Sequence, residues 1–143
     1  MRERVADCGL PLIYAHLVGG QDEVIFEGRS FALNAQGETV ARAEGFREAD
    51  LAVQASVGQQ GVDLSAAPEA LVPMASADAE LWDALVLGVR DYVGKNGFKG
   101  AILGLSGGID SALVLAIAVD AIGADKIHAV MMPSPYTADI SWI

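Results

Sequence analysis

The segment from Gly100 to Met132 constrains the fold more than any other part of the 143-residue chain. GAILGL is a short, continuous apolar run, SALVLAIAVDAIG is a longer apolar run that ends at a glycine, and KIHAVMM is a second short apolar run. Short apolar runs on either side of an apolar helix predict a βαβ unit whose strands are parallel and buried on both faces. The sequence therefore predicts an α/β fold in the second half of the chain.

The residues SGGIDS join the first apolar run to the predicted helix. In a parallel sheet, ligands bind beyond the carboxyl ends of the strands, where a loop leads into a helix N-terminus. Gly107 and Gly108 allow the backbone to approach a ligand closely, and the first helical amides favour an anion. Ser106 and Ser111 add hydroxyl donors, whereas Asp110 suits a Mg²⁺ ion that bridges phosphates, because hard cations prefer oxygen ligands. The pattern indicates a phosphate-binding loop, with a strand-to-helix turn capped by Asp110 as the alternative.

Two common phosphate-binding motifs are absent from this loop. No Gly-Lys-Ser/Thr follows the glycines, so the loop is not a Walker A loop of the kinase or GTPase type. The loop also lacks the GxGxxG spacing of dinucleotide-binding folds.

Charge and composition restrict the partners of the chain. The formal net charge is −10 and the pI is about 4.4, with no cluster of lysine and arginine, which argues against a nucleic-acid partner. Cys8 is the single cysteine, so no intramolecular disulfide forms, as is usual in a reducing cytoplasm. The longest apolar run, Ala112–Val119, is too short to span a bilayer, and the N-terminus lacks the apolar core of a signal peptide. We expect a cytoplasmic protein with no membrane partner.

The first half of the chain has the pattern of strands. Residues 10–18 are rich in β-forming side chains, and the segment from Phe31 to Val40 predicts two strands joined through the loop 34–37. Residues 50–57 predict a last short strand. Residues 58–77 contain two prolines and no steady periodicity, so they are interpreted as a linker between domains.

An amphipathic helix is predicted from Asp78 to the dipeptide Asn96-Gly97, which is typical of a helix end. Trp82 on this helix is interpreted as a packing residue. One βαβ unit has too little sheet to bury its own faces, so the chain is expected to cover the end of one domain and the start of another. The apolar stripe of the helix is expected to contain Leu81, Leu85, Val89 and Val93.

The loop and its surroundings resemble a known family. Ser-Gly-Gly-x-Asp-Ser after an apolar strand resembles the phosphate loop of the ATP pyrophosphatases, or PP-loop enzymes, which cleave ATP between the α and β phosphates. GLSGGIDSALVLAIAVDAIGADKIHAVMMPSPYT resembles the start of the synthetase domain of NAD⁺ synthetases, including Met132–Ser134. PLIYAHLVGGQDEVIFEGRSFALNAQGE resembles the last part of the nitrilase-like glutaminase domain fused to that synthetase. Two signatures in the expected order identify the chain as a member of the glutamine-dependent NAD⁺ synthetase family. The resemblance covers nearly the whole chain but only a middle part of the length of the family's proteins.

The resemblance implies an α/β fold in two parts. Residues 1–57 would be the β-rich remnant of a nitrilase-like αββα domain, the carbon-nitrogen hydrolase that acts as glutaminase. Residues 58–77 would be the linker. Residues 78–143 would begin the PP-loop domain, a doubly wound parallel sheet of the adenine nucleotide alpha hydrolase-like type, of which the chain contains the first βαβ unit.

The resemblance also implies a reaction. ATP and Mg²⁺ would adenylate the carboxylate of nicotinic acid adenine dinucleotide with release of pyrophosphate, and ammonia from glutamine would then displace AMP to give NAD⁺. The missing lysine fits a loop that holds the β and γ phosphates as one departing unit. Full-length members are typically homo-oligomers. Asp110 is the implied metal ligand, and the ATP site would consist of Gly104, Leu105, Ser106, Gly107, Gly108, Ile109, Asp110 and Ser111.

Catalytic residues of the glutaminase are not expected in this chain, because the family's nucleophilic cysteine precedes the segment present here. Cys8 does not match the context of that nucleophile, so the chain alone is expected to be inactive. Another PP-loop adenylating amidotransferase and a non-catalytic nucleotide-binding remnant are the alternative functions.

Several positions depart from the family's pattern or leave two interpretations open. His16 stands where the family usually has asparagine, and Glu27 replaces a common aspartate. The GGQDE segment, residues 19–23, is interpreted either as a structured turn or as part of the glutamine site or of a domain interface. His128 is expected to be a strand residue, and residues 133–137 are expected on the ligand side of the sheet.

Overall fold

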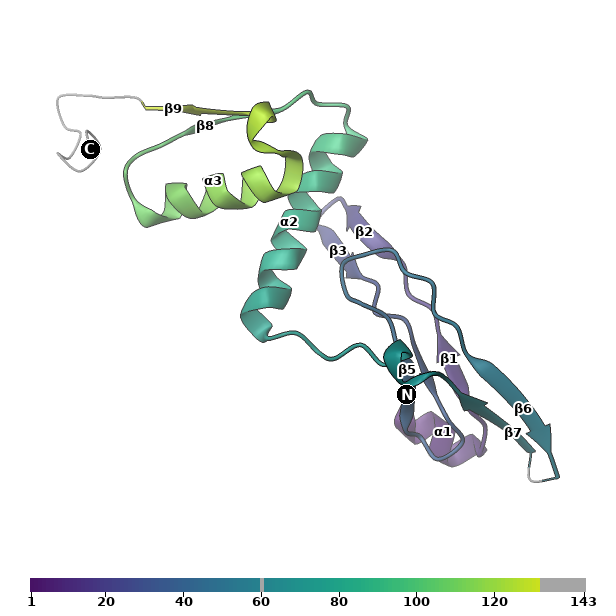
Figure 1. Ribbon diagram of the computed structural model, residues 1–143. Coiled ribbons are helices and arrows are strands. Elements are labelled where there is room, and N and C mark those ends of the chain that lie inside the picture. Colours follow the sequence, from purple (N-terminus) through teal and green to yellow (C-terminus); the bar gives the residue numbers. More distant parts are fainter. Residues whose placement is uncertain (60, 132–143) are drawn as a thin grey trace. The chain divides into compact units, whose positions relative to one another are not determined.

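The computed structural model describes residues 1–59 and 61–131, whose helices and strands are drawn in Figure 1. The expectations for Met132–Ser134 and for residues 133–137 fall outside this range. The chain is α/β and divides into two compact units. The first unit contains Met1–Gly19 and Phe26–Glu80, and the second contains Gly20–Ile25 and the chain from Leu81 onward.

An antiparallel three-stranded sheet forms the centre of the first unit. Its strand order is β1 (Leu12–Tyr14), β4 (Phe31–Leu33) and β5 (Thr39–Arg42). Ala32 and Ala41 are paired across β4 and β5, and both are completely buried. Their small side chains leave room for the apolar residues that pack over this face of the sheet.

The remaining elements of the first unit surround this sheet. Helix α1 (Arg2–Cys8), which the sequence did not predict, ends at a left-handed glycine and buries Val5. Strands β6 (Gln54–Gly58) and β7 (Gly61–Ser65) form an antiparallel hairpin, and Leu64 of β7 joins the buried alanines in the core.

The predicted loop between β4 and β5 is confirmed. Asn34 is buried, and its Oδ1 accepts hydrogen bonds from the N–H groups of Gln36 at 3.1 Å and of Glu38 at 2.8 Å. Gly37 has a φ of 80°, in the left-handed region that glycine adopts without steric cost. The asparagine side chain therefore replaces backbone hydrogen bonds within the turn.

Part of the segment 58–77 is more regular than predicted. It contains strand β7 and the 3₁₀-helix η1 (Pro68–Ala70), and Ala66 and Ala70 pack against the core of the first unit. Strand β7 is short and mostly exposed, and Leu64 is its one buried residue. A strand with a single buried side chain shows no clear periodicity in its sequence.

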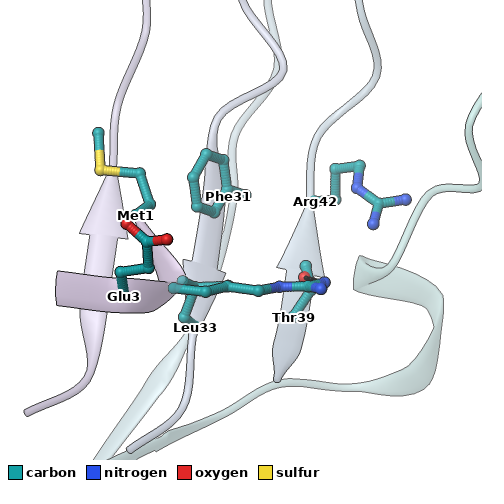
Figure 2. A pocket seen from close by; sticks show the side chains of 7 residues that line it. Met1, Glu3, Phe31, Leu33, Thr39 and Arg42 are labelled. Carbon is teal, nitrogen blue, oxygen red and sulfur yellow. Dashed lines mark hydrogen bonds between the residues drawn. The ribbon is translucent and has the colours of Figure 1, made fainter. Parts of the chain in front are cut away.

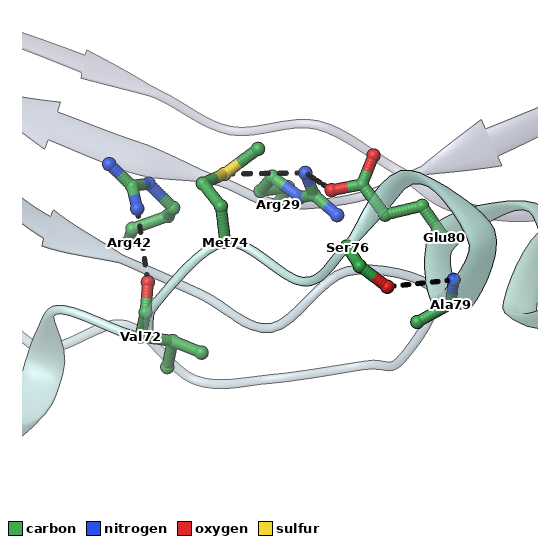
Figure 3. A network of polar contacts seen from close by, with 7 residues as sticks. All are labelled: Arg29, Arg42, Val72, Met74, Ser76, Ala79 and Glu80. Atoms are coloured by element: carbon green, nitrogen blue, oxygen red, sulfur yellow. Dashed lines mark hydrogen bonds and ion pairs between the residues drawn. The ribbon is translucent and has the colours of Figure 1, made fainter.

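Arg29 fixes the start of helix α2 (Ala77–Lys95) within the first unit, as Figure 3 shows. Its Nη1 forms an ion pair with Glu80 Oε1 at 2.6 Å and also contacts Met74 Sδ at 3.4 Å. Ser76 Oγ accepts the N–H of Ala79 at 3.3 Å, which satisfies one of the free amides in the first turn.

Strands β2 (Val18–Gln21) and β3 (Val24–Glu27) pair as a hairpin whose tip, Gly20–Ile25, belongs to the second unit. Residues 10–18, which were predicted to have the character of strands, contain all of β1 and the first residue of β2, Val18.

The predicted βαβ unit is present in the second unit. Strand β8 (Ala101–Gly104) leads through a loop into helix α3 (Ile109–Ile122), and the 3₁₀-helix η2 (Ala124–Lys126) leads into strand β9 (Ile127–Val130). Strands β8 and β9 are parallel, with Ala101 opposite Ile127.

Burial of both strands on both faces was predicted, and this prediction is wrong for the described chain. Ile102 is 77% exposed and Val130 is 43% exposed, whereas Leu103 and Ile127 are half-buried. Helix α3 contacts both strands, and two strands with a single helix leave the alternate side chains uncovered within the described residues.

The helix predicted from Asp78 to Asn96-Gly97 is confirmed as α2, but its apolar stripe was predicted only in part, because Val89 and Val93 are on the buried face whereas the two leucines are not. Leu81 is 61% exposed and Leu85 is 43% exposed. Val86 is buried against Ile117 and Ala121 of α3. The half-buried side chains of Trp82 and Val89 extend this contact, so the stripe runs through Trp82, Val86, Val89 and Val93.

Candidate functional site

The candidate phosphate loop lies between β8 and α3. Leu105 N–H donates to the carbonyl of Val130 at 2.9 Å, so the backbone pairing continues just past the strand ends. Gly107 has a φ of 77°, which favours glycine, and Gly108 is the extended residue from which α3 begins. The two glycines thus turn the chain from the carboxyl end of the strand into the N-terminus of the helix.

Two serine hydroxyls form hydrogen bonds within this loop. Ser111 Oγ donates to the carbonyl of Gly108 at 2.9 Å and accepts the N–H of Ser106 at 3.3 Å. The two hydroxyl oxygens lie 3.2 Å apart, and Ser106 Oγ accepts the N–H of Gly108 at 3.4 Å. The structure therefore brings the two predicted serines together across the turn.

Asp110 is exposed in the first turn of α3. Helix α3 begins at Ile109 with Gly108 at the N-cap position, and no side chain forms a capping hydrogen bond there. The alternative interpretation, in which Asp110 serves as the helix cap, is therefore wrong. Its carboxylate remains accessible at the mouth of the loop.

The donor set of the loop suits phosphate and a hard cation. The amides of residues 109–111 have no partners within the helix, because the first turn of a helix leaves its N–H groups unpaired. These amides and the helix dipole favour an anion, and the carboxylate of Asp110 supplies an oxygen ligand. Across residues 1–59 and 61–131 there is no group of three or more His, Cys, Asp or Glu side chains placed to hold a metal ion.

A separate cavity, shown in Figure 2, lies within the first unit and has a volume of about 570 Å³. None of the phosphate-loop residues lines it, and it contains no cluster of catalytic groups. Arg2 Nη2 and Thr39 Oγ1 are 3.5 Å apart across its wall. Its lining residues are Met1, Arg2, Glu3, Phe31, Leu33, Thr39 and Arg42.

The GGQDE segment forms the tip of the β2–β3 hairpin, as the structured-turn interpretation predicted. Asp22 has a φ of 54°, in the left-handed region, which aspartate tolerates better than most residues. Gly20 N–H donates to Asp91 Oδ2 at 2.7 Å, and Lys95 Nζ donates to the carbonyl of Gly20 at 2.6 Å. Asp91 and Lys95 themselves form an ion pair of 2.9 Å on α2.

Sequence reasoning missed Asp91 and Lys95. The available signal was their separation of four residues, which places a carboxylate and an ammonium group side by side on a helix. Partial burial alone would raise the pKa of Asp91. The hydrogen bonds from Lys95 and Gly20 and the positive charges of Lys95 and Arg90 outweigh this effect and lower the pKa below its ordinary value.

His16 forms hydrogen bonds and aromatic contacts with neighbouring residues of the first unit. Its N–H donates to Ser30 Oγ at 3.0 Å, and its Nδ1 lies 3.1 Å from the carbonyl of Gly28, a distance at which a protonated Nδ1 donates a hydrogen bond. An asparagine amide offers the same kind of donor. The ring also packs near Tyr14 and Phe26, with centroid distances of 5.5 and 6.1 Å.

Two further side chains carry no sign of a catalytic role. Cys8 is an exposed free cysteine, and no hydrogen bond joins it to His16 in the part of the chain that the structure describes. His128 lies exposed on β9, as predicted for a strand residue.

No helix in residues 1–59 and 61–131 combines the length and apolar character that a membrane span needs.

The chain is similar in sequence to proteins of known function. A family model described as NAD synthase matches residues 81–142, which include most of α2, the phosphate loop and α3. Over 92% of its length, the chain is 52% identical to a glutamine-dependent NAD⁺ synthetase from Synechocystis. The predicted resemblance to glutamine-dependent NAD⁺ synthetases is confirmed.

Solved structures of NAD⁺ synthetases agree with this assignment. A glutamine-dependent NAD⁺ synthetase from Acinetobacter baumannii, solved in complex with ADP, matches 99% of the chain with a TM-score of 0.87 and 44% identity. A second, from Cytophaga hutchinsonii, matches with a TM-score of 0.68 at 18% identity and so supports the fold alone. The chain spans about a quarter of the length of these relatives, 23% of the Synechocystis protein and 26% of the Acinetobacter baumannii chain.

Proposed function

We propose that this chain supplies the ATP-binding loop of a glutamine-dependent NAD⁺ synthetase. The observation that carries the proposal is the SGGIDS loop, with its two linked serines at the N-terminus of α3, inside a segment that matches the NAD synthase family. The proposed reaction is the ATP-dependent amidation of nicotinic acid adenine dinucleotide to NAD⁺ through an adenylated intermediate. Glutamine is the proposed source of ammonia.

Each part of the loop has a role in this proposal. The amides at the start of α3 and the hydroxyls of Ser106 and Ser111 bind the pyrophosphate portion of ATP, while Gly107 and Gly108 keep side chains out of its way. Asp110 holds Mg²⁺, which would offset the charge of the phosphates and so favour departure of pyrophosphate. The full set of loop positions is Gly104 to Ser111.

The domain assignment is part of the same proposal. Residues 1–57 correspond to the end of the nitrilase-like glutaminase domain, residues 58–77 to the connection, and residues 78–143 to the start of the doubly wound PP-loop domain. The resemblance of PLIYAHLVGGQDE to the glutaminase end supports the first part, and the parallel pairing of β8 and β9 supports the last. Residues that complete the substrate sites are proposed to come from other parts of the complete gene product.

The test uses the complete gene product that contains these residues. We expect it to form NAD⁺ from nicotinic acid adenine dinucleotide, ATP and Mg²⁺ with either glutamine or ammonia, releasing one AMP and one pyrophosphate for each NAD⁺. Asp110→Ala should lower this rate by about a hundredfold or more, in the range seen when a group that stabilises transition-state charge is removed. The matched control is Asp83→Ala, which removes an exposed carboxylate from α2 and should retain full activity.

The outcomes separate the proposed function from its alternative. Nucleotide binding without turnover would favour the non-catalytic interpretation. Unchanged activity of Asp110→Ala would remove Asp110 from the metal site but leave the family's reaction intact.

A further inference from the structure

Both backbone polar groups of Gly20 are bound by one ion pair on helix α2. Its N–H donates to Asp91 Oδ2 at 2.7 Å, and its carbonyl accepts from Lys95 Nζ at 2.6 Å, while Asp91 and Lys95 lie 2.9 Å apart. We call these three residues the Gly20 clamp. The hydrogen bonds are charge-assisted, which makes them stronger than bonds between neutral groups.

The clamp depends on a close approach between the hairpin tip and the helix. A Cβ atom on Gly20 would lie 3.3 Å from Asp91 Cβ and 3.4 Å from Gly88 Cα. A Cβ atom on Gly88 would lie 2.9 Å from Ile25 Cδ1. Two glycines, one on the hairpin and one on α2, therefore leave the space that the backbone of the turn and the side chain of Ile25 occupy.

The clamp joins two stretches that carry different sequence signatures. The hairpin lies in the segment that resembles the end of the glutaminase domain, whereas α2 lies in the match to the NAD synthase family from residue 81 onward. The hairpin tip and this part of α2 nevertheless belong to one compact unit. Gln21, Asp22 and Glu23 of the tip share a cavity of about 620 Å³ with residues of α2.

A continuous set of contacts leads from the clamp to the phosphate loop. Helix α2 carries Asp91 and, further along, Val86, which packs against Ile117 and Ala121 of α3. Helix α3 begins at the phosphate loop and supplies Ser111 to it. Chains of packed side chains on rigid helices can transmit a change of position between sites.

We propose that Asp91 and Lys95 are positioning residues that hold the GGQDE turn on α2 and thereby link the use of glutamine to the ATP-dependent step. This inference rests on the proposed function. Loss of the clamp should impair NAD⁺ formation with glutamine as nitrogen donor and spare NAD⁺ formation with free ammonia. A residue that only stabilised the fold would affect both reactions alike.

The experiment compares the two nitrogen donors in the complete gene product. Asp91→Asn removes the charge that binds Lys95, and we expect the rate with glutamine to fall about tenfold, within the range typical of coupling between sites. The rate with saturating ammonia should change less than about twofold. Lys95→Met should behave in the same way, and Asp91→Glu, which keeps a carboxylate, should recover part of the glutamine-dependent rate.

Matched controls remove the same charges from exposed positions nearby in sequence. Asp83→Asn lies on the same helix, and Lys99→Met follows it; both side chains are exposed, and neither takes part in the clamp. These variants should keep the wild-type ratio of the two rates. An equal loss of both rates in Asp91→Asn, or no loss in either, would overturn the positioning role. Absence of NAD⁺ formation by the wild-type protein with ammonia would instead overturn the proposed function, and this inference with it.

Discussion

Trp82 Nε1 of helix α2 donates a hydrogen bond of 3.0 Å to Asp120 Oδ2 of helix α3. The indole also packs against the cluster of Val86, Ile117 and Ala121, so one side chain joins the two helices in two ways. The apolar contact places its body in the interface, while the carboxylate satisfies its N–H. Trp82 is thus the packing residue that the sequence predicted, with an additional polar contact.

Two substitutions at Trp82 separate these contributions. Trp82→Phe removes the hydrogen bond and keeps an aromatic ring, so the free energy of unfolding should fall by about 0.5 to 1 kcal/mol. Trp82→Ala also removes the packing and should cost about 2 kcal/mol or more. Urea unfolding of the chain measures both values. Asp120→Asn retains an acceptor and serves as the control, with a change close to zero. Equal costs for the two Trp82 variants would contradict a contribution from packing.

Gly88 and Gly94 on α2 provide a second pair of substitutions. Alanine favours a helix over glycine by up to about 1 kcal/mol. A Cβ atom on Gly94 meets nothing within 4 Å, so Gly94→Ala should raise the melting temperature. A Cβ atom on Gly88 would lie 2.9 Å from Ile25 Cδ1, so Gly88→Ala should gain less or lose stability. An equal gain from both variants in thermal unfolding would show that Ile25 does not pack on Gly88.

The lowered pKa of Asp91 gives its clamp a defined pH dependence. The ionised carboxylate stabilises the folded chain, because its pKa is lower there than in the unfolded chain. An aspartate in an unfolded chain titrates at about 3.9. This contribution is fully present above the unfolded pKa and is lost as the pH falls through the folded pKa. Wild type should therefore be more stable than Asp91→Asn at pH 7.

The measurement is the difference in melting temperature between wild type and Asp91→Asn across a pH series. This difference should shrink as the pH falls below about 4. Asp22 and Glu23 line the same cavity, but they are present in both proteins and therefore do not contribute to the difference. A difference that stays constant from neutral to acid pH would contradict the role of the ionised carboxylate.

The sequence predicted those features that arise from local patterns. The apolar runs around SGGIDS were sufficient for the βαβ unit, because two strands and a helix of matching length have few other arrangements. The Asn34–Gly37 loop followed from turn chemistry, since asparagine and glycine each satisfy a specific requirement of a tight turn.

Features that depend on contacts between distant residues were missed. The contact face of α2 is set by where α3 packs, so Val86 is buried while Leu81 and Leu85 are exposed despite their helical spacing. The Gly20 clamp joins Gly20 to Asp91 and Lys95, which follow it in sequence by 71 and 75 positions. No local pattern in the hairpin indicates these partners. Helix α1 has a short polar sequence with Val5 as its single buried residue, too weak a pattern to predict it.

Gly107 and Gly37 allow backbone strain to be separated from ligand binding. Their φ angles are 77° and 80°, in the left-handed region where a side chain is unfavourable. Gly107 lies in the phosphate loop, whereas Gly37 lies in the β4–β5 loop of the first unit, where a Cβ atom meets nothing within 4 Å. Alanine at either position should therefore cost about 1 kcal/mol of stability from the backbone.

The two alanine variants should differ in their effect on ATP. Gly107→Ala disturbs the turn that places Ser106 and the first amides of α3, so the KM for ATP in the complete gene product should rise about tenfold or more. Gly37→Ala should leave the KM for ATP unchanged, although its thermal stability falls by a similar amount. Steady-state rates of pyrophosphate release at varied ATP measure both. If the two variants had equal KM values for ATP, the left-handed turn at Gly107 would be a folding requirement with no part in nucleotide binding.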